Sequence, residues 1–271
     1  MASISQKEFQ LLSEYIEIHY GIHLKEEKQS LLAGRLQNIL LQMGFQSFTE
    51  YYNYLVADKS GKAGSLLVDK VTTNHTYFMR ETNHFYYFRD IVLPFLMRTV
   101  KDKDLRIWCA ACSSGEEAYT LAMIVDEVFG NDKLWWDTKI LATDISESVL
   151  EKARKGIYHN EQTAPLPMQW RSRYFKKYDN ESSVITDRLK NEVLFRKLNL
   201  MEQVFPFKKK IQVIFCRNVM IYFDKKTREA LINKFYDVLD YGGYLFIGHS
   251  ESITRGTSGF TYVCPAVYRK E

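Results

Sequence analysis

The stretch that decides the fold is LRIWCAACSSGEEAYT, residues 105–120. Its first half, Ile107–Ala111, is apolar and predicts a buried strand, and Cys112–Gly115 form a tight turn of small residues. Glu116 and Glu117 then open a helix, where acidic side chains suit the positive end of the helix dipole. Small residues let a ligand approach the backbone, and ligands bind at the carboxyl ends of strands in open α/β sheets. Because no GxGxxG fingerprint is present, this stretch alone favours an ordinary strand–helix turn.

Strands and helices alternate downstream of this turn. The helix over Glu116–Val128 is followed by a strand over Thr138–Thr143 and a helix over Glu147–Lys155. The alternation returns in the last third of the chain, with strands over Val193–Leu200, Ile211–Cys216 and Tyr244–Gly248 and a hairpin around Phe260–Tyr268. The helix over Lys225–Leu239 is expected to stop at Gly242–Gly243. Such alternation predicts an α/β fold with a doubly wound, mostly parallel sheet.

Asp144 follows the second predicted strand and has two readings. A ribose or amino-acid ligand lying across the first two strands needs an acid at this position. Asp144 could equally cap the next helix, as Ser146 could. The residue alone does not decide between the two.

Two further segments break the α/β pattern. Residues 1–70 predict a small helical domain, with capping boxes at Ser5–Glu8 and Ser47–Glu50 and a helix over Glu26–Met43 between them. This domain holds seven Lys or Arg and eight Asp or Glu residues, so it is not basic overall. Residues 157–190 contain prolines and aromatic residues without a helical period, and predict an inserted β-hairpin or three-stranded unit.

Between the two domains lies TTNHTYFMRE, residues 72–81. It shows no clean period and predicts an extended linker, residues 71–83, before the α/β domain at 84–271. Because it is rich in aromatic residues, we expect it to pack against the domain or a ligand. Thr82 and Asn83 are expected to cap a helix over His84–Met97 that ends or kinks at Pro94.

Composition excludes several classes of protein. A net charge of +4 in 271 residues does not demand a nucleic-acid partner. The chain has no signal peptide and no apolar run of about 18 residues, so we expect a cytoplasmic protein without direct membrane insertion. Cys109 and Cys112 form a CxxC, but no second CxxC or histidine pair accompanies it. Buried free thiols are therefore expected, and no metal site.

The chain resembles the CheR family of S-adenosylmethionine-dependent chemotaxis receptor methyltransferases. The resemblance covers nearly the whole chain and is carried, in order, by TTNHTYFMRE, SSGEEAYTLAMI, ATDIS, KLNL, IFCRNVMIYFD and GGYLFIGHSES. It implies a helical domain joined to a Rossmann-like methyltransferase domain with an inserted β-subdomain. The implied activity is methyl transfer to glutamate side chains on the cytoplasmic helices of chemotaxis receptors, with S-adenosylhomocysteine as the second product.

The resemblance also implies the site residues. Arg80 and Tyr222 match residues placed near the transferred methyl group. The matching cofactor-binding positions are Asn74, Thr76, Arg80, Glu116 or Glu117, Asp144, Asn199, Leu200, Cys216, Arg217 and Asn218. The sequence leaves open which of the two glutamates faces the cofactor.

The chemistry of these side chains agrees with the implied roles. Asp144 suits ribose hydroxyls, Arg80 can pair with a carboxylate in bidentate fashion, and Asn199 can read an adenine edge. A carboxylate nucleophile is ionised at neutral pH, so methyl transfer needs positioning and exclusion of water rather than a general base. This explains a chain without a Ser/His/Asp set or a metal motif.

The chain departs from the family pattern in two places. On the second helix, Arg35 matches a proposed receptor-docking arginine, but Asn38 and Leu41 stand where further basic residues would be expected. The segment KKYDNESSVITDRLKNEV lacks the glycine with which some members bind a receptor C-terminal pentapeptide, so no strong tether is expected. Two other functions remain open on this fold: a non-catalytic receptor-binding adaptor, and a dinucleotide-dependent oxidoreductase.

Overall fold

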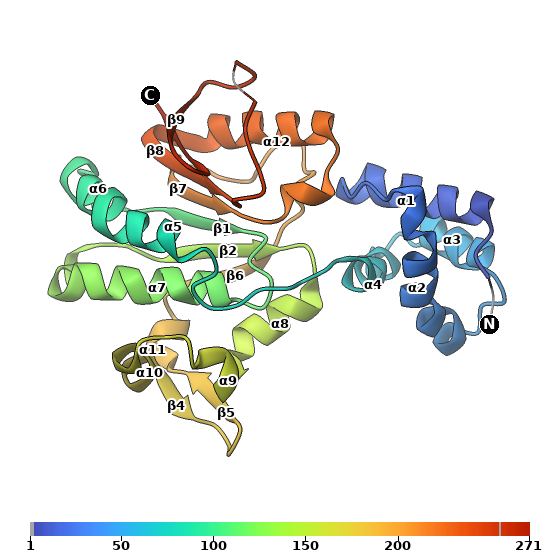
Figure 1. The fold of residues 1–271 in the computed structure, drawn as a ribbon, viewed down its shortest axis with the longest axis horizontal. Helices are drawn as coiled ribbons and strands as arrows, with labels where there is room; N and C mark the ends of the chain where they lie inside the picture. Colours follow the sequence, from blue (N-terminus) through green and yellow to red (C-terminus); the bar gives the residue numbers. More distant parts are fainter. Residues whose placement is uncertain (1–2, 255) are drawn as a thin grey trace.

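A computed structural model describes residues 3–254 and 256–271. Figure 1 shows a helical domain beside an α/β domain, with a small β-subdomain projecting from the lower edge of the α/β domain, below α7 and α8. The α/β architecture, the separate helical domain and the inserted subdomain are as predicted. No helix in the described ranges combines the length and apolarity that a bilayer crossing requires.

The helical domain packs four helices around one apolar core. They are α1 (Gln6–Tyr20), α2 (Gln29–Met43), α3 (Phe48–Ala57) and α4 (Lys62–Val71). Ser5 forms the predicted capping box with Glu8, and Gly21 ends α1 with a left-handed φ of 71°. Residues Glu26–Lys28 form a separate 3-10 turn before α2, so that helix starts later than predicted. At the second predicted box, Ser47 caps α3, but Glu50 accepts from the backbone of Gln46 instead of closing the box.

The main sheet has the order β6-β2-β1-β7-β8-β10-β9. Its strands are β1 (Ile107–Ala110), β2 (Ile140–Asp144), β6 (Val193–Lys197), β7 (Ile211–Cys216), β8 (Leu239–Ile247), β9 (Phe260–Cys264) and β10 (Val267–Lys270). The first five in the order are parallel, and β10 and β9 are antiparallel. The glycine pair Gly242–Gly243 was predicted to stop a helix. It instead lies inside β8, because pairing with β7 extends that strand back to Leu239.

Helices cover both faces of this sheet, as a doubly wound fold requires (Figure 1). Ile107 and Cys109 point into the core beneath α5–α8, whereas Trp108 and Ala110 point into the core beneath α12. The covering helices are α5 (Thr82–Tyr87), α6 (Leu93–Thr99), α7 (Glu116–Phe129), α8 (Glu147–Lys155) and α12 (Lys225–Val238). Because β1 is buried on both sides, its sequence is apolar throughout rather than alternating.

The predicted helix over His84–Met97 is in fact three consecutive segments. A π-helical turn, Phe88–Val92, separates α5 from α6. Pro94 lies in the first turn of α6, directly after the π-helical turn, and does not end the helix. Thr82 is the first residue of α5 rather than its cap, and Glu81 stands at the N-cap with φ 57°.

The inserted β-subdomain is an antiparallel sheet of order β3-β5-β4 with three short helices. Its elements are β3 (Ile157–His159), α9 (Asn160–Thr163), α10 (Met168–Tyr174), β4 (Phe175–Lys177), β5 (Ser182–Ile185) and α11 (Asp187–Lys190). Asp126 of α7 anchors it, since the buried carboxylate accepts from Arg173, Tyr174 and Arg188 at 2.8, 3.0 and 2.7 Å.

Candidate active site

A cavity of about 440 Å³ lies at the carboxyl ends of the parallel strands. It adjoins the point where the strand order reverses, because β2 and β7 flank β1 on opposite sides. The residues from the sequence prediction that line it are Asn74, Thr76, Arg80, Glu117, Asp144, Asn199, Leu200, Arg217, Asn218, Tyr222 and Arg35. Segments up to 203 residues apart in the chain, from Tyr20 to Phe223, therefore meet around one space large enough for a nucleotide-sized ligand.

The floor of the cavity is the turn after β1. Ala111, Ser113 and Gly115 all have positive φ, at 64°, 49° and 97°. This succession of left-handed residues turns the chain sharply from the strand into α7, which explains the small residues in SSG. The Ser113 hydroxyl donates to the backbone carbonyl of Asn74 at 3.0 Å, so the turn also holds the linker.

Asp144 acts both as a structural residue and as part of the cavity wall. Its two oxygens accept the backbone N–H groups of Ser113 and Ser146 at 2.8 and 3.0 Å. Burial raises the pKa of Asp144, although both N–H groups oppose the shift. Ser146 is the cap of α8, accepting from the N–H of Val149, so the capping reading applies to Ser146. Each Asp144 oxygen retains a lone pair for a ligand hydroxyl.

The structure separates the two glutamates of the turn. Glu117 lines the cavity and pairs with Arg217 at 3.0 Å, while its other oxygen accepts from the Cys109 thiol at 3.1 Å. Glu116 is buried, accepts from the Ser114 hydroxyl at 2.7 Å and does not line the cavity. Burial raises the pKa of both carboxyls. Glu117 is the glutamate that a bound ligand can reach.

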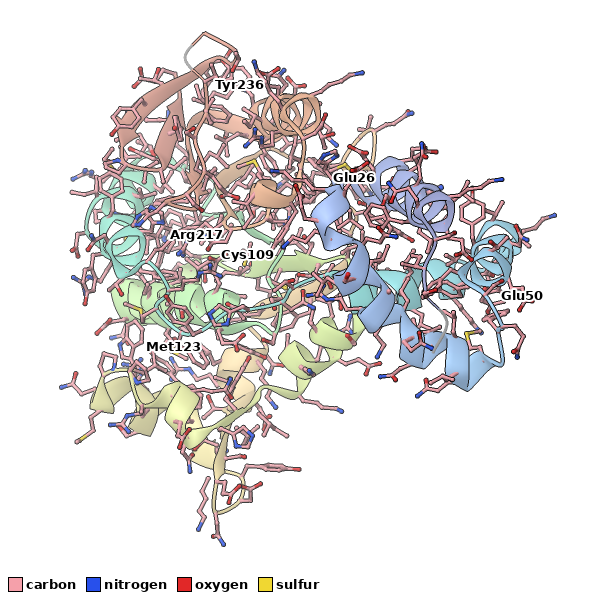
Figure 2. All side chains as sticks on the ribbon, turned by 45° about the vertical axis from the view of Figure 1, so that its right-hand side comes forward. Glu26, Glu50, Cys109, Met123, Arg217 and Tyr236 are labelled. Atoms are coloured by element: carbon pink, nitrogen blue, oxygen red, sulfur yellow. The ribbon has the colours of Figure 1, made fainter. Side chains whose placement is uncertain are left out.

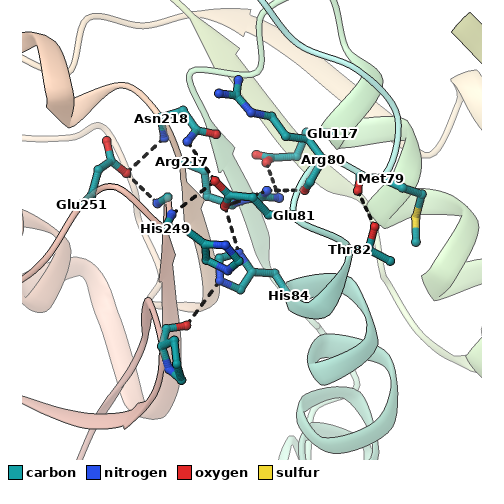
Figure 3. A network of polar contacts seen from close by, with 12 residues as sticks. Met79, Arg80, Glu81, Thr82, His84, Glu117, Arg217, Asn218, His249 and Glu251 are labelled. Atoms are coloured by element: carbon teal, nitrogen blue, oxygen red, sulfur yellow. Dashed lines mark hydrogen bonds and ion pairs between the residues drawn. The ribbon is translucent and has the colours of Figure 1, made fainter.

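Arg217 does not point freely into the cavity. Its side chain is 1% exposed and lies between the carboxylates of Glu81 and Glu117, which are 3.1 and 3.0 Å away (Figure 3). It also donates to the backbone carbonyl of Arg80. Figure 2 shows Arg217 in the interior of the α/β domain, close to Cys109 of β1. Arg217 therefore braces the site from within.

Arg80 is the arginine that reaches into the cavity. Its guanidinium donates to the backbone carbonyl of His75 at 2.7 Å, which leaves its remaining N–H groups for a ligand. Beside it, Asn218 has φ 58°, and its side-chain amide donates to Glu81 at 3.1 Å. The linker and the segment after β7 thus present their polar groups to the same space.

The helical domain closes the cavity from the other side. The N–H of His23 donates to the carbonyl of Tyr222 at 2.8 Å, and Asn199 donates to the carbonyl of His19 at 2.7 Å. Arg35 donates to the carbonyl of Val71 and to the Thr73 hydroxyl. Other wall residues from this domain are Tyr20, Lys25, Lys28 and Leu31. The sequence prediction had assigned this domain no part in the cavity.

Two predicted positions lie elsewhere. Cys216 is fully buried in the core beneath α12 and, like Glu116, does not line the cavity. Burial raises the pKa of its thiol. The four cysteines are free; Cys109, Cys112 and Cys216 are buried as predicted, whereas Cys264 is only partly buried. Glu81 was passed over by sequence reasoning, although its place directly after Arg80 in an otherwise uncharged linker was a usable signal.

Comparison with known proteins decides the family. Residues 7–72 match the CheR methyltransferase all-alpha domain, and residues 74–267 match the CheR methyltransferase SAM-binding domain. The chain belongs to the CheR methyltransferase family. The boundary between the two matched CheR domains falls at the start of the linker. The match to the SAM-binding domain begins at Asn74, which lines the cavity and is one of the predicted cofactor-binding residues.

CheR family relatives align along almost the whole chain. The chemotaxis protein methyltransferase of Borreliella burgdorferi is 44% identical over 271 residues, covering 99% of this chain and 95% of the relative. That of Escherichia coli is 34% identical, covering 98% and 91%. A probable chemotaxis protein methyltransferase of Rhizobium etli is 38% identical, covering 86% and 88%. These relatives agree with the family resemblance that the motifs indicated.

Proposed function

We propose that this CheR family member transfers the methyl group of S-adenosylmethionine to glutamate side chains of chemotaxis receptors. The products are glutamate methyl esters and S-adenosylhomocysteine. The observation that carries the proposal is the meeting of Arg80, Asp144 and Asn218 on one cavity that the helical domain walls off. The relatives named as chemotaxis methyltransferases, which match both domains, support it.

The cavity residues suit the parts of this cofactor. Asp144 has acceptors free for the ribose hydroxyls, and Glu117 offers a carboxylate to the amino group of the methionine moiety. Asn199 keeps one amide N–H beyond the bond to His19 and can donate it to the adenine ring. Arg80 pairs with a carboxylate, either that of the cofactor or that of the incoming glutamate.

The chemistry requires placement more than proton transfer. The cofactor, when bound, supplies a methyl group activated on a sulfonium. The glutamate oxygen forms a bond to this carbon while the carbon–sulfur bond breaks, and no proton is moved. Arg80 and Tyr222 orient the nucleophile, and the helical domain excludes water that would compete for the methyl group. This accounts for a site built without a general base.

The decisive experiment is transfer of labelled methyl from S-adenosylmethionine to receptor-containing membranes. We expect incorporation as base-labile esters, and Arg80→Ala to lose most of it because the carboxylate loses its partner. A protein that binds S-adenosylmethionine but transfers no label would be the non-catalytic adaptor. Binding of NAD in its place would indicate the oxidoreductase. Near-normal methylation by Arg80→Ala would remove the role proposed for that residue.

Receptor recognition is proposed to rest on Arg35 and its neighbours, without a pentapeptide tether. Arg35 is partly engaged by the linker, so it presents only part of its guanidinium to a partner. The β4–β5 turn has no glycine and is closed by Asp179, which accepts the N–H groups of Glu181 and Ser182 at 2.8 and 2.6 Å. Micromolar binding of a receptor C-terminal pentapeptide to residues 156–190 would contradict this.

A further inference from the structure

The Glu81 carboxylate occupies the centre of the polar network behind the cavity (Figure 3). One oxygen accepts from the side-chain amide of Asn218 at 3.1 Å and from the backbone N–H of His249 at 3.2 Å. The other accepts from Nη2 of Arg217 at 3.1 Å. Glu81 does not line the cavity, and its side chain is 15% exposed. A single side chain therefore joins the linker to the segments that follow β7 and β8.

This network determines where Arg80 stands. Arg217 donates with the same nitrogen to the Glu81 carboxylate and to the Arg80 carbonyl, so it holds both the backbone after Arg80 and the side chain of the next residue. Met79 and Glu81, the neighbours of Arg80, have φ values of 61° and 57°. Left-handed backbone at two non-glycine residues is unfavourable and persists only where surrounding contacts impose it. At Glu81 itself, the contacts of its carboxylate with Arg217, Asn218 and His249 hold this conformation.

The negative charge of Glu81 also affects the position of the Arg217 side chain. Arg217 is shared between Glu81 and Glu117, and all three side chains lie largely out of solvent. With Glu81 neutralised, Glu117 would be the sole carboxylate partner of this cation among the described residues. The Arg217 side chain would then be free to shift toward Glu117 and release the Arg80 carbonyl. The charge of Glu81 thus acts on the position of Arg80, through Arg217.

We propose that Glu81 is a positioning residue for methyl transfer, acting through Arg217 to hold Arg80 in the cavity. The inference rests on the proposed function and extends it to a residue that does not touch the cofactor or the substrate. Loss of Glu81 should therefore impair turnover in the same way as loss of Arg80, and for the same reason.

A metal-binding role for the same cluster is less consistent with its contacts. Glu81, His84 and His249 bring one ligand atom each within 4.8 Å of one another, and Nδ1 of buried His84 has no hydrogen-bond partner. Both Glu81 oxygens, however, already accept from N–H donors, and one of these belongs to the positively charged Arg217. A cation there would have to displace a guanidinium whose side chain is 1% exposed.

The test is a double-mutant cycle between Glu81→Gln and Arg80→Ala, measured as receptor methylation at saturating S-adenosylmethionine. Both oxygens of Glu81 face donors, so the amide of glutamine must oppose one of them. We expect Glu81→Gln to lower kcat about 10²-fold. In the Arg80→Ala background, the same change should cost no more than about twofold. S-adenosylhomocysteine affinity, measured by calorimetry, reports separately on the cofactor site.

Asp126→Asn is the matched control, because it also removes a buried carboxylate that is paired with arginines. Asp126 lies on α7, nine residues beyond Glu117. It should leave kcat unchanged and combine additively with Arg80→Ala. If Glu81→Gln fails to fold, Glu81→Asp, which keeps the charge but shortens the reach, takes its place in the cycle. Additive losses for Glu81 and Arg80, or wild-type turnover in the Glu81 variant, would overturn the inference.

The remaining outcomes separate this inference from the proposed function. If the wild-type protein methylates no receptor, the proposed function fails before any variant is compared. If the wild type is active and the Glu81 cycle is additive, only the positioning role fails. Activity that rises with added Zn²⁺ in the wild type and not in Glu81→Gln would favour the metal reading and overturn positioning.

Discussion

Asp144 accepts the backbone N–H of Ser113 at 2.8 Å, and this bond ties the end of β2 to the turn that follows β1. The second oxygen of Asp144 accepts the N–H of Ser146 at 3.0 Å. One carboxylate therefore shapes the floor of the cavity and faces the ligand proposed to bind there.

Replacing Asp144 by asparagine should weaken S-adenosylhomocysteine binding about tenfold to a hundredfold, the worth of a hydrogen bond to a charged group. The amide would also oppose one of the two N–H groups with its own donor. Isothermal titration calorimetry gives the affinity. Asp104→Asn is a suitable control, since Asp104 pairs with Arg106 and Lys209 outside the cavity. Affinity within about twofold of wild type would contradict the ribose role.

Cofactor affinity should also depend on pH through Asp144. Burial raises the pKa of this carboxyl, so it protonates at higher pH than an exposed aspartate. S-adenosylhomocysteine binding should therefore weaken as pH falls through the raised pKa, and Asp144→Asn should lack this step. The free energy of unfolding should change in the opposite direction and rise as pH falls through the raised pKa. The reason is that a raised pKa means that the folded state binds the proton more tightly than the unfolded chain does. Titrations and urea unfolding across the acidic range test both signs.

The β-subdomain should depend on Asp126 for its attachment. Asp126→Asn should lower the free energy of unfolding by about 2 kcal/mol at neutral pH, because its charged hydrogen bonds to Arg173 and Arg188 are lost. Burial raises the pKa of Asp126, but the hydrogen bond from Tyr174 and the charges of Lys133 and Arg188 outweigh burial and lower this pKa overall. Its contribution is thus present above the unfolded pKa and lost as pH falls through the folded pKa. Urea unfolding should show that the free energies of unfolding of the wild type and Asp126→Asn converge as the pH becomes acidic. A difference that stays constant with pH would contradict a stabilising role for the Asp126 charge.

Gly115 is the glycine that the turn after β1 requires. Its φ is 97°, and an added Cβ would lie 2.9 Å from the Cβ of Ala153 and 3.1 Å from the hydroxyl of Tyr158. Gly115→Ala should destabilise the protein by about 1–3 kcal/mol through backbone strain and crowding. Gly34→Ala on α2, where a Cβ meets nothing within 4 Å, should instead stabilise it by about 1 kcal/mol. Thermal or urea unfolding of both variants checks the difference in sign.

Element types were predictable wherever local chemistry specified them. The apolar run of β1, the Ser5–Glu8 capping box and the acids opening α7 each specify a structure within a few residues. The prediction was wrong where tertiary pairing overrode a local signal. Gly242–Gly243 is a helix stop by composition, but both residues lie inside β8, in the irregular stretch between the pairs Ile211–Leu239 and Val213–Tyr244.

The candidate site likewise has a part that was predictable from sequence motifs and a part that depends on tertiary contacts. Most of the site residues that the family resemblance implied line the cavity, with Arg80, Asp144 and Asn218 among them. It did not predict that Arg217 would be enclosed by Glu81 and Glu117, nor that the helical domain would supply a wall. Glu81 and Arg217 are 136 residues apart in the chain, and no local pattern records such a pairing.

The sequence by itself determined the alternation of strands and helices, the helical domain, the inserted subdomain and the family. These features were predictable because periodicity, helix caps and motifs each depend on a few neighbouring residues. Only the tertiary structure decided which glutamate of LRIWCAACSSGEEAYT faces the cavity and which residues hold Arg80. Those outcomes depend on side chains that distant segments bring within hydrogen-bond distance. Burial then decides which charges are paired, and it is set by the packed fold as a whole.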